Sequence, residues 1–363
     1  MEIGLVIYGS LKQRSGGYLY DRKLVEGLNS LGDRVNIISL PSRTYTGNLL
    51  SNFSRELMRR LTARPFDVLL EDQLTHPSLL LPNRRLRRAG SSYPIVTLVH
   101  HLRSSEPHSR ALRSAYRSVE RAYLRTVDGA IYNSRVTRSE VDRALGMKLP
   151  GVVAHPGRDH LNRQVDPQAI RDRASRHLPL RLVFLGNLIP RKGLHILLES
   201  LAALPSDRWR LTVIGSLEFD RSYSASIRRE VERMNGKVRL LGPLPHDRLQ
   251  EHLMRSHAMV IPSSYEGFGI AYLEGMGFGL PAIATIAGGA SDFVRDGENG
   301  YLIPPNDPSA LVDRLASLDA DRALLAQMGE QALADFNSHP TWEESVTKIR
   351  RFLVEQTERK PRF

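Results

Sequence analysis

The sequence has 363 residues and contains no cysteine, which excludes disulfide bonds and thiolate chemistry and fits a reducing compartment. It also has no apolar run close to the roughly 20 residues that a membrane-spanning helix requires. The first residues, Met1 to Gly9, lack the basic segment that opens a secretory signal peptide. We therefore expect a cytoplasmic protein.

Signals for bound cofactors are also missing. No Gly-x-Gly-x-x-Gly motif follows the first predicted strand, residues 3–8, which argues against a dinucleotide-binding oxidoreductase. No group of neighbouring histidines and carboxylates stands out as a metal site. We therefore expect neither a metal ion nor another cofactor.

Acidic residues are scarce in the first part of the chain. Residues 1–150 hold 24 Lys and Arg residues against 13 Asp and Glu residues, and they account for nearly all of the net charge of +12. Such an excess attracts polyanions, such as an anionic membrane surface, a nucleic acid or a phosphorylated acceptor.

The pattern of apolar residues predicts alternating strands and helices, which is typical of an α/β fold with parallel sheets. A length of 363 residues favours two or three domains. We predict a first domain over residues 1–160, an arginine-rich crossover, and a second domain over residues 178–339. A C-terminal segment, residues 340–363, is expected to return to the first domain. The last strand is predicted at residues 281–285.

One stretch, residues 262–281, dominates the second half. Gly267 and Gly269 form a turn between a predicted strand and a helix, where glycines and free backbone N–H groups favour a phosphate. Glu266 and Glu274 are separated by seven residues and frame this turn. Carboxylates beside a phosphate site are best explained by sugar hydroxyls, which donate hydrogen bonds to them. A nucleotide sugar combines both groups, whereas a buried turn with two capping acids is the simpler alternative.

This stretch resembles the Glu-x7-Glu signature of the retaining glycosyltransferases of family 4, and the residues between the glutamates also fit. The resemblance implies a GT-B fold, in which two Rossmann-like domains face each other across a cleft. It implies transfer of a hexose from a UDP- or GDP-hexose with retention of configuration, by front-side attack in which the departing diphosphate takes the acceptor proton. Glu266 would orient the sugar hydroxyls, Glu274 would bind the ribose, and Phe268 would lie at the donor.

A second glycine-bounded turn, residues 186–193, precedes another predicted helix. Lys192 and Arg191 at the helix entrance are suited to a diphosphate. The family commonly has an arginine after the first glycine of this turn, but here Asn187 occupies that position. Arg191 would then supply the missing charge; otherwise the phosphate depends on Lys192 alone.

Other candidate site residues follow from the same resemblance. Gly17, in the loop after the first strand, would offer its backbone N–H to the diphosphate. His100, at the end of the strand predicted at 94–99, would lie near the donor sugar, although the sequence does not decide between His100 and His101. Three further positions would contact the base: Gly215, Leu240 and Leu241.

Arginines recur on one face of the helix predicted between residues 105 and 126: Arg110, Arg113, Arg117, Arg121 and Arg125. The opposite face carries Leu112, Tyr116, Val119 and Tyr123, and we expect it to pack inward. The arginine face is either an ordinary solvated surface or a contact with anionic lipid, aided by the basic cluster at residues 84–88. Nucleic-acid binding is not expected, because aromatic residues are not interleaved with the basic ones.

The sequence therefore predicts a cytoplasmic, metal-independent retaining hexosyltransferase. Its acceptor is either a lipid or lipid-linked glycan, with the protein peripheral at the inner face of the membrane, or a soluble molecule; the arginine face favours the first. The main alternative is a weak or inactive nucleotide-sugar or polyanion-binding protein of the same fold, which Asn187 favours. A glycan phosphorylase shares the architecture but requires a pyridoxal cofactor and a much longer chain.

Overall fold

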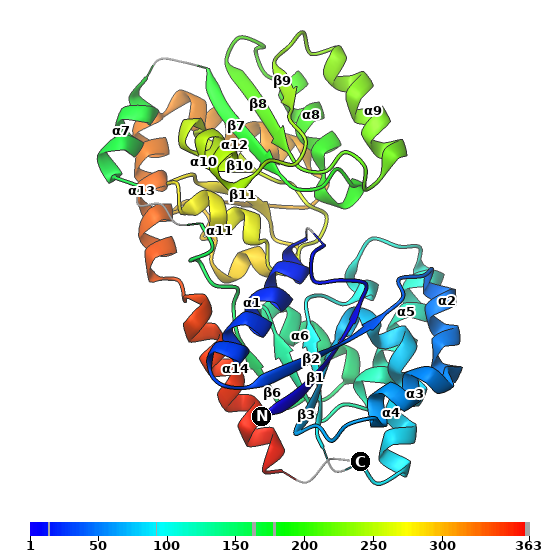
Figure 1. Ribbon diagram of the computed structural model, residues 1–363. Coiled ribbons are helices and arrows are strands. Elements are labelled where there is room, and N and C mark those ends of the chain that lie inside the picture. Colours follow the sequence, from blue (N-terminus) through cyan, green and yellow to red (C-terminus); the bar gives the residue numbers. More distant parts are fainter. Residues whose placement is uncertain (14, 92, 162–164, 177–178, 360–363) are drawn as a thin grey trace. The chain divides into compact units, whose positions relative to one another are not determined.

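The computed structural model describes residues 1–13, 15–91, 93–161, 165–176 and 179–359. The chain forms two compact units, the first made of residues 1–157 and 340–363 and the second of residues 158–339 (Figure 1). Two boundaries predicted from the sequence, residue 178 and residue 363, lie outside the described residues. The second unit begins at Arg158, so it includes residues 158–160, which were predicted in the first domain, and the segment expected to be a crossover.

The first unit is built on a six-stranded parallel sheet in the order β2-β1-β3-β4-β5-β6. Its strands are β1 Glu2–Tyr8, β2 Arg34–Leu40, β3 Val68–Asp72, β4 Ile95–Val99, β5 Gly129–Tyr132 and β6 Gly151–Val153. Its α-helices are α1 Gly16–Ser30, α2 Tyr45–Leu50, α3 Arg55–Thr62, α4 His76–Arg88, α5 Arg110–Leu124, α6 Arg135–Leu145 and α14 Trp342–Thr357, with short 3-10 turns at 51–53, 73–75 and 103–105.

Helix α14 joins the first unit although it lies at the far end of the sequence. Thr341 and Glu344 form a capping box that fixes the start of the helix. Its apolar side includes Ile349 and Leu353, which are buried in the same core as strands β1 and β3. Helices α1 and α14 lie side by side (Figure 1), and Val346 packs directly against Gly27.

The second unit repeats this architecture, with the strand order β12-β11-β10-β7-β8-β9. Its strands are β7 Leu180–Leu185, β8 Trp209–Ile214, β9 Val238–Leu240, β10 Ala258–Val260, β11 Ala282–Thr285 and β12 Gly300–Ile303. Its α-helices are α7 Pro167–Ser175, α8 Leu194–Ala202, α9 Arg221–Glu232, α10 His246–Arg255, α11 Ile270–Met276, α12 Pro308–Ala320 and α13 Arg322–Ser338, with 3-10 turns at 190–192 and 289–292.

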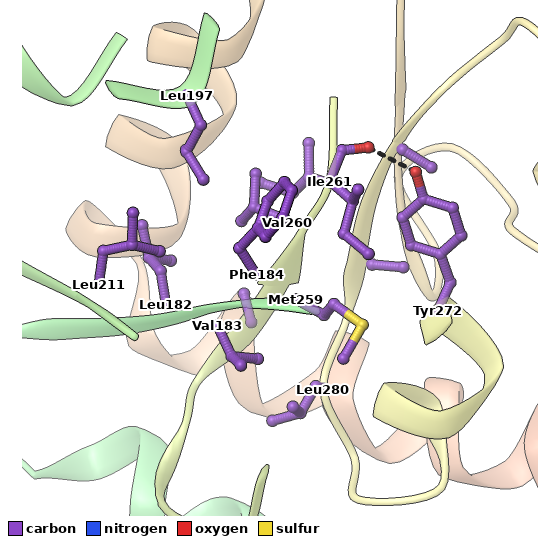
Figure 2. Packing of buried hydrophobic residues seen from close by; sticks show 14 of the residues in the cluster. Leu182, Val183, Phe184, Leu197, Leu211, Met259, Val260, Ile261, Tyr272 and Leu280 are labelled. Atoms are coloured by element: carbon purple, nitrogen blue, oxygen red, sulfur yellow. Dashed lines mark hydrogen bonds between the residues drawn. The ribbon is translucent and has the colours of Figure 1, made fainter. Parts of the chain in front are cut away.

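The core of the second unit anchors the turn after β10. Figure 2 shows Val183 and Phe184 of β7 packed near Met259 and Val260 of β10, all fully buried. The hydroxyl of Tyr272 on α11 donates a 2.5 Å hydrogen bond to the carbonyl of Ile261. Strand, turn and helix are therefore held as one rigid piece.

The α/β class with parallel sheets is confirmed, but several elements differ from the prediction. Strand β11 is not the last, because β12 follows it and pairs with it. Strand β6 was not predicted, and helix α7 lies where an irregular crossover was expected. No helix in the described part of the chain is long and apolar enough to span a membrane.

Candidate donor and acceptor site

The two predicted phosphate turns of the second unit meet at the carboxyl ends of β7 and β10. The backbone N–H of Ser264 donates to the carbonyl of Arg191 over 2.8 Å, and Arg191 Nη1 donates to the carbonyl of Tyr265 over 2.5 Å. Gly193 ends the first turn with a φ of 73°, and a Cβ there would lie 2.1 Å from the carbonyl oxygen of Pro262. Only glycine allows the two turns to approach this closely.

Glu266 stands at the centre of this contact. Its Oε1 lies 2.6 Å from Lys192 Nζ and accepts a 2.7 Å hydrogen bond from Ser263 Oγ, while its Oε2 lies 3.6 Å from Arg191 Nη1. The backbone of Glu266 is bridged to Gly288 in the loop after β11, where a Cβ would clash with the Glu266 carbonyl. Three loops therefore fix the position of this carboxylate.

The electrostatics of the cluster favour an added anion. Burial by itself would raise the pKa of Glu266, but Lys192 and Arg191 outweigh it and lower the pKa to about 2. Glu266 is therefore ionised at neutral pH. Two cations surround one carboxylate, so a net positive charge remains at the ends of the strands, where ligands bind in parallel sheets.

Glu274 lies on α11 and is partly exposed. Its Oε1 is 2.7 Å from Nε2 of His160, whose side chain is almost completely buried. Sequence reasoning missed His160, which lies at the predicted end of the first domain and belongs to no motif. A histidine that bonds a partly exposed carboxylate restrains that carboxylate in one orientation.

In the first unit, Gly17 and His100 are brought together. A Cβ on Gly17 would lie 3.3 Å from Cδ2 of the His100 ring, so the glycine leaves room for the imidazole. His100 Nε2 is 2.9 Å from Oδ1 of Asp21. Burial alone would lower the pKa of His100, but the Asp21 carboxylate outweighs it and the pKa is raised. His101 instead contacts Glu106, at 3.0 Å.

Asp21, Asp72 and His100 form the one described group with the residue types and spacing of a metal site. One ligand atom from each lies within 4.8 Å of the others, and all three side chains are buried. Burial and the neighbouring Asp21 raise the pKa of Asp72 to about 7. Near neutral pH, Asp72 therefore carries a proton in part of the population.

Two family models match the chain. Residues 16–160 match the model described as Glycosyltransferase Family 4, and residues 167–335 match the model described as Glycosyl transferases group 1. The two matched ranges together include most of both units. The chain belongs to the family 4 glycosyltransferases.

Individual relatives are distant. An uncharacterised glycosyltransferase of Methanocaldococcus jannaschii is 30% identical over 174 residues, which are 48% of this chain and 47% of that protein. A D-inositol 3-phosphate glycosyltransferase of Corynebacterium urealyticum is 24% identical over 92% of this chain and 89% of that protein. The chain thus spans about half the length of the first relative and most of the length of the second.

Solved glycosyltransferase structures share the fold. Sucrose-phosphate synthase from Thermosynechococcus elongatus has a TM-score of 0.81 at 20% identity, and the match covers 98% of each chain. HepE of Anabaena, solved in complex with UDP-glucose, has a TM-score of 0.76 at 18% identity, covering 99% of this chain and 100% of that chain. These similarities confirm the GT-B fold class.

Within this family 4 glycosyltransferase, several predicted donor contacts have structural tasks of their own. Asn187 Oδ1 accepts a 3.3 Å hydrogen bond from the backbone N–H of Ser216 and so links the loops after β7 and β8. The side chain of Phe268 is 2% exposed and stacks on Phe293 at 4.7 Å. The Phe268 side chain is therefore part of the packing of the second unit, and the predicted donor contact at this position would involve the backbone of the turn.

The three positions predicted to contact the base lie at the ends of β8 and β9. The N–H of Gly215 donates to the carbonyl of Gly242, and the N–H of Leu241 donates to the carbonyl of Val213, so both amides are already bonded. The side chains of Leu240 and Leu241 are partly buried against the core of the second unit. They leave some apolar surface at the strand ends.

The arginine face of the glycosyltransferase lies on α5, where its members are exposed: Arg110, Arg113, Arg117, Arg121 and, just after the helix, Arg125. The opposite face packs inward at Tyr116 and Tyr123, but the prediction was wrong for Leu112, which is 42% exposed. The basic cluster on α4 is also smaller than expected, because Arg87 is buried in an ion pair with Asp128.

Proposed function

We propose that this protein is a retaining glycosyltransferase that moves a hexose from a UDP- or GDP-sugar to an acceptor. The observation that carries the proposal is the contact of the two turns of the second unit, where Lys192 and Arg191 flank Glu266 at the ends of parallel strands. The family membership of the chain supports it, as does the structure of HepE with bound UDP-glucose.

The proposed reaction assigns each group a task. Lys192 and Arg191 stabilise the negative charge that develops on the departing diphosphate, which makes a metal ion unnecessary. Glu266, ionised and fixed by three loops, accepts hydrogen bonds from sugar hydroxyls. Glu274, restrained by His160, binds the ribose.

The bond changes balance without another reactant. The acceptor oxygen forms a bond to the anomeric carbon on the face from which the diphosphate leaves. The bond between that carbon and the diphosphate oxygen breaks, and the acceptor proton passes to the diphosphate. His100, held by Asp21, is proposed to contact the donor sugar, and Gly17 to contact the diphosphate through its N–H.

For the acceptor, we propose a lipid or lipid-linked glycan at an anionic membrane surface. The exposed arginines on α5 support this, since each basic residue near such a surface contributes about 1 kcal/mol of binding free energy. The bonded amide side chain of Asn187, at the position where the family commonly has an arginine, favours a second candidate, a weak or inactive donor-binding protein.

A thermal-shift comparison of UDP, GDP, ADP and TDP, each with EDTA and with magnesium, tests the proposal. A nucleotide at 100 times its dissociation constant should stabilise the fold by about 2.7 kcal/mol. We expect one nucleotide to raise the melting temperature equally with and without magnesium. No shift with any nucleotide would contradict the donor site, and binding without turnover would favour the second candidate.

A further inference from the structure

Arg103 lies at the carboxyl edge of the sheet of the first unit, in the 3-10 turn Arg103–Ser105 that follows β4. His100 precedes it by three residues on the same edge. Tyr45 begins α2 after β2, and His76 begins α4 after β3. Four side chains that are far apart in the sequence thus belong to the loops where parallel sheets bind ligands.

Two tyrosine rings hold the guanidinium of Arg103. Its Cζ lies 5.4 Å from the ring centroid of Tyr45 and 5.0 Å from that of Tyr116, and the two rings contact each other at 4.7 Å. Cation–π contacts on two rings fix the plane of a guanidinium. The two tyrosine rings contact the guanidinium of Arg103 but accept no hydrogen bond from its N–H groups.

Those N–H groups have no acceptor within the described residues. Nε of Arg103 is buried and makes no hydrogen bond, and neither terminal nitrogen makes a hydrogen bond or an ion pair. A buried donor without a partner is costly, which makes Nε of Arg103 an unusual feature of this edge of the sheet. The two rings thus hold the guanidinium while its N–H groups face no acceptor among the described residues.

The acidic groups nearby are already bonded elsewhere. The carboxylate of Glu120 accepts hydrogen bonds from the backbone N–H groups of Arg103 and Ser104, at 2.6 and 3.3 Å, and from Gln73 at 3.1 Å. Glu106 contacts His101. Burial and Arg103 lower the pKa of His76 to about 4, so this histidine is neutral at pH 7. The charge of Arg103 is therefore available to an anion.

We propose that Arg103 binds a phosphate group carried by the acceptor. A planar fork of N–H donors matches two oxygens of a phosphate, and the tyrosine rings hold the fork in place before the ligand arrives. The inference depends on the proposed function, because it assigns the acceptor a chemical class. The phosphate belongs either to a small soluble molecule or to a lipid headgroup.

The first experiment uses glycerol 3-phosphate as the probe and glycerol as the uncharged comparison, with titration calorimetry in saturating UDP and GDP so that the donor site is filled. We expect the protein to bind glycerol 3-phosphate and not glycerol. Arg103→Gln should weaken that binding at least tenfold, and Arg103→Lys should weaken it less, because a lysine keeps the charge but loses the fork. Arg143→Gln, at an exposed arginine in the last turn of α6, serves as the matched control and should leave glycerol 3-phosphate binding unchanged.

A second arm addresses the lipid source, with vesicles of phosphatidic acid compared with vesicles of phosphatidylcholine. If the phosphate is a lipid headgroup, Arg103→Gln should weaken binding to phosphatidic acid at least tenfold. The proposal is overturned if the wild-type protein binds neither probe, or if Arg103→Gln binds them as well as wild type does. Nucleotide binding is measured separately, as a test of the donor site and of folding. If the wild-type protein binds no nucleotide, the proposed function is contradicted, whereas the proposal for Arg103 is decided by the phosphate probes.

Discussion

Single side chains decide whether the second unit can hold a donor, and Glu274 gives the simplest test. Its carboxylate is partly exposed and oriented by His160, so it is placed to bind ribose hydroxyls. We predict that Glu274→Ala weakens nucleotide binding about 10- to 100-fold, because hydrogen bonds to a charged group contribute about 1.5–3 kcal/mol. Titration calorimetry with the nucleotide that wild type binds is the measurement.

The matched control for this prediction is Glu298→Gln, a change at an exposed glutamate that pairs with Arg295. It should leave nucleotide affinity unchanged. Equal affinities for wild type and Glu274→Ala would remove Glu274 from the site.

Sequence reasoning identified the residues of the donor turns but not their neighbours. The spacing of Glu266 and Glu274 was readable because one local motif contains both. The partners of these residues are distant in the chain, since His160 lies 114 positions from Glu274, and Lys192 lies in a different turn from Glu266. Such contacts depend on the order of strands in the sheet, which no local pattern encodes.

The turn at residues 186–193 and the turn after β10 lie close together, and this approach positions the ion pair of Lys192 and Glu266. Gly193→Ala would place a Cβ 2.1 Å from the carbonyl of Pro262 and would also strain a φ of 73°. We predict a loss of more than about 2 kcal/mol in the free energy of unfolding, because the conformation alone costs about 1–2 kcal/mol. Urea unfolding is the measurement.

Gly236→Ala isolates the cost of the backbone conformation. Gly236 has a φ of 75°, but no atom of the described residues lies within 4 Å of the position that a Cβ would take there. Gly236→Ala should lower the free energy of unfolding less than Gly193→Ala does. The difference between the two losses measures the cost of forcing the two turns apart. Equal losses for the two variants would show that the turns do not need to approach so closely.

Strand β3 is tied to helices α4 and α5 through Glu71, which accepts hydrogen bonds from Asn83 at 3.0 Å and Tyr123 at 2.8 Å. Burial raises the pKa of Glu71 to about 7, above its usual value of 4.5. The contribution of Glu71 to the free energy of unfolding is thus fully present below pH 4.5 and is lost as the pH rises through 7.

We therefore predict that Glu71→Gln is more stable than wild type at pH 8, by up to about 3 kcal/mol, and that the difference shrinks toward pH 5. Glutamine keeps the acceptor oxygen for Asn83 and Tyr123 but carries no charge. Urea unfolding between pH 5 and 8 is the measurement, with exposed Glu232→Gln as control. Parallel pH profiles for wild type and Glu71→Gln would contradict the raised pKa.

The elements themselves were largely predictable, because buried parallel strands appear as short apolar runs and most helices begin at a serine, threonine or aspartate cap. Strand β12 was missed because the Gly300–Ile303 run is only four residues long and was hidden behind a polar loop. Helical periodicity placed Leu112 inward, yet it lies in the first turn of α5, whose buried residues begin only at Tyr116.

For the whole molecule, the uneven charge predicts where it meets a membrane. The exposed arginines on α5 should draw the first unit to anionic lipid, and three of them together contribute about 3 kcal/mol. We predict that the triple change of Arg113, Arg117 and Arg121 to Gln weakens sedimentation with phosphatidylglycerol vesicles by roughly 100-fold. Binding by wild type should also weaken as salt is added.

The control is the same number of exposed arginines changed to Gln on α9 of the second unit: Arg221, Arg228 and Arg229. These should leave vesicle binding almost unchanged. If both triple variants lose binding equally, net charge and not the α5 surface is responsible.

Proton NMR of UDP-glucose and GDP-mannose, with wild type and with Lys192→Met in EDTA, tests whether the protein is a retaining transferase that uses Lys192 in place of a metal. We expect wild type to release sugar slowly from one donor, and the first sugar formed to have the anomeric configuration of that donor. Lys192→Met should slow this release at least about 100-fold, because the diphosphate loses its cation. Release of the opposite anomer would show that configuration is not retained, and equal rates for the two proteins would show that Lys192 does not act on the diphosphate.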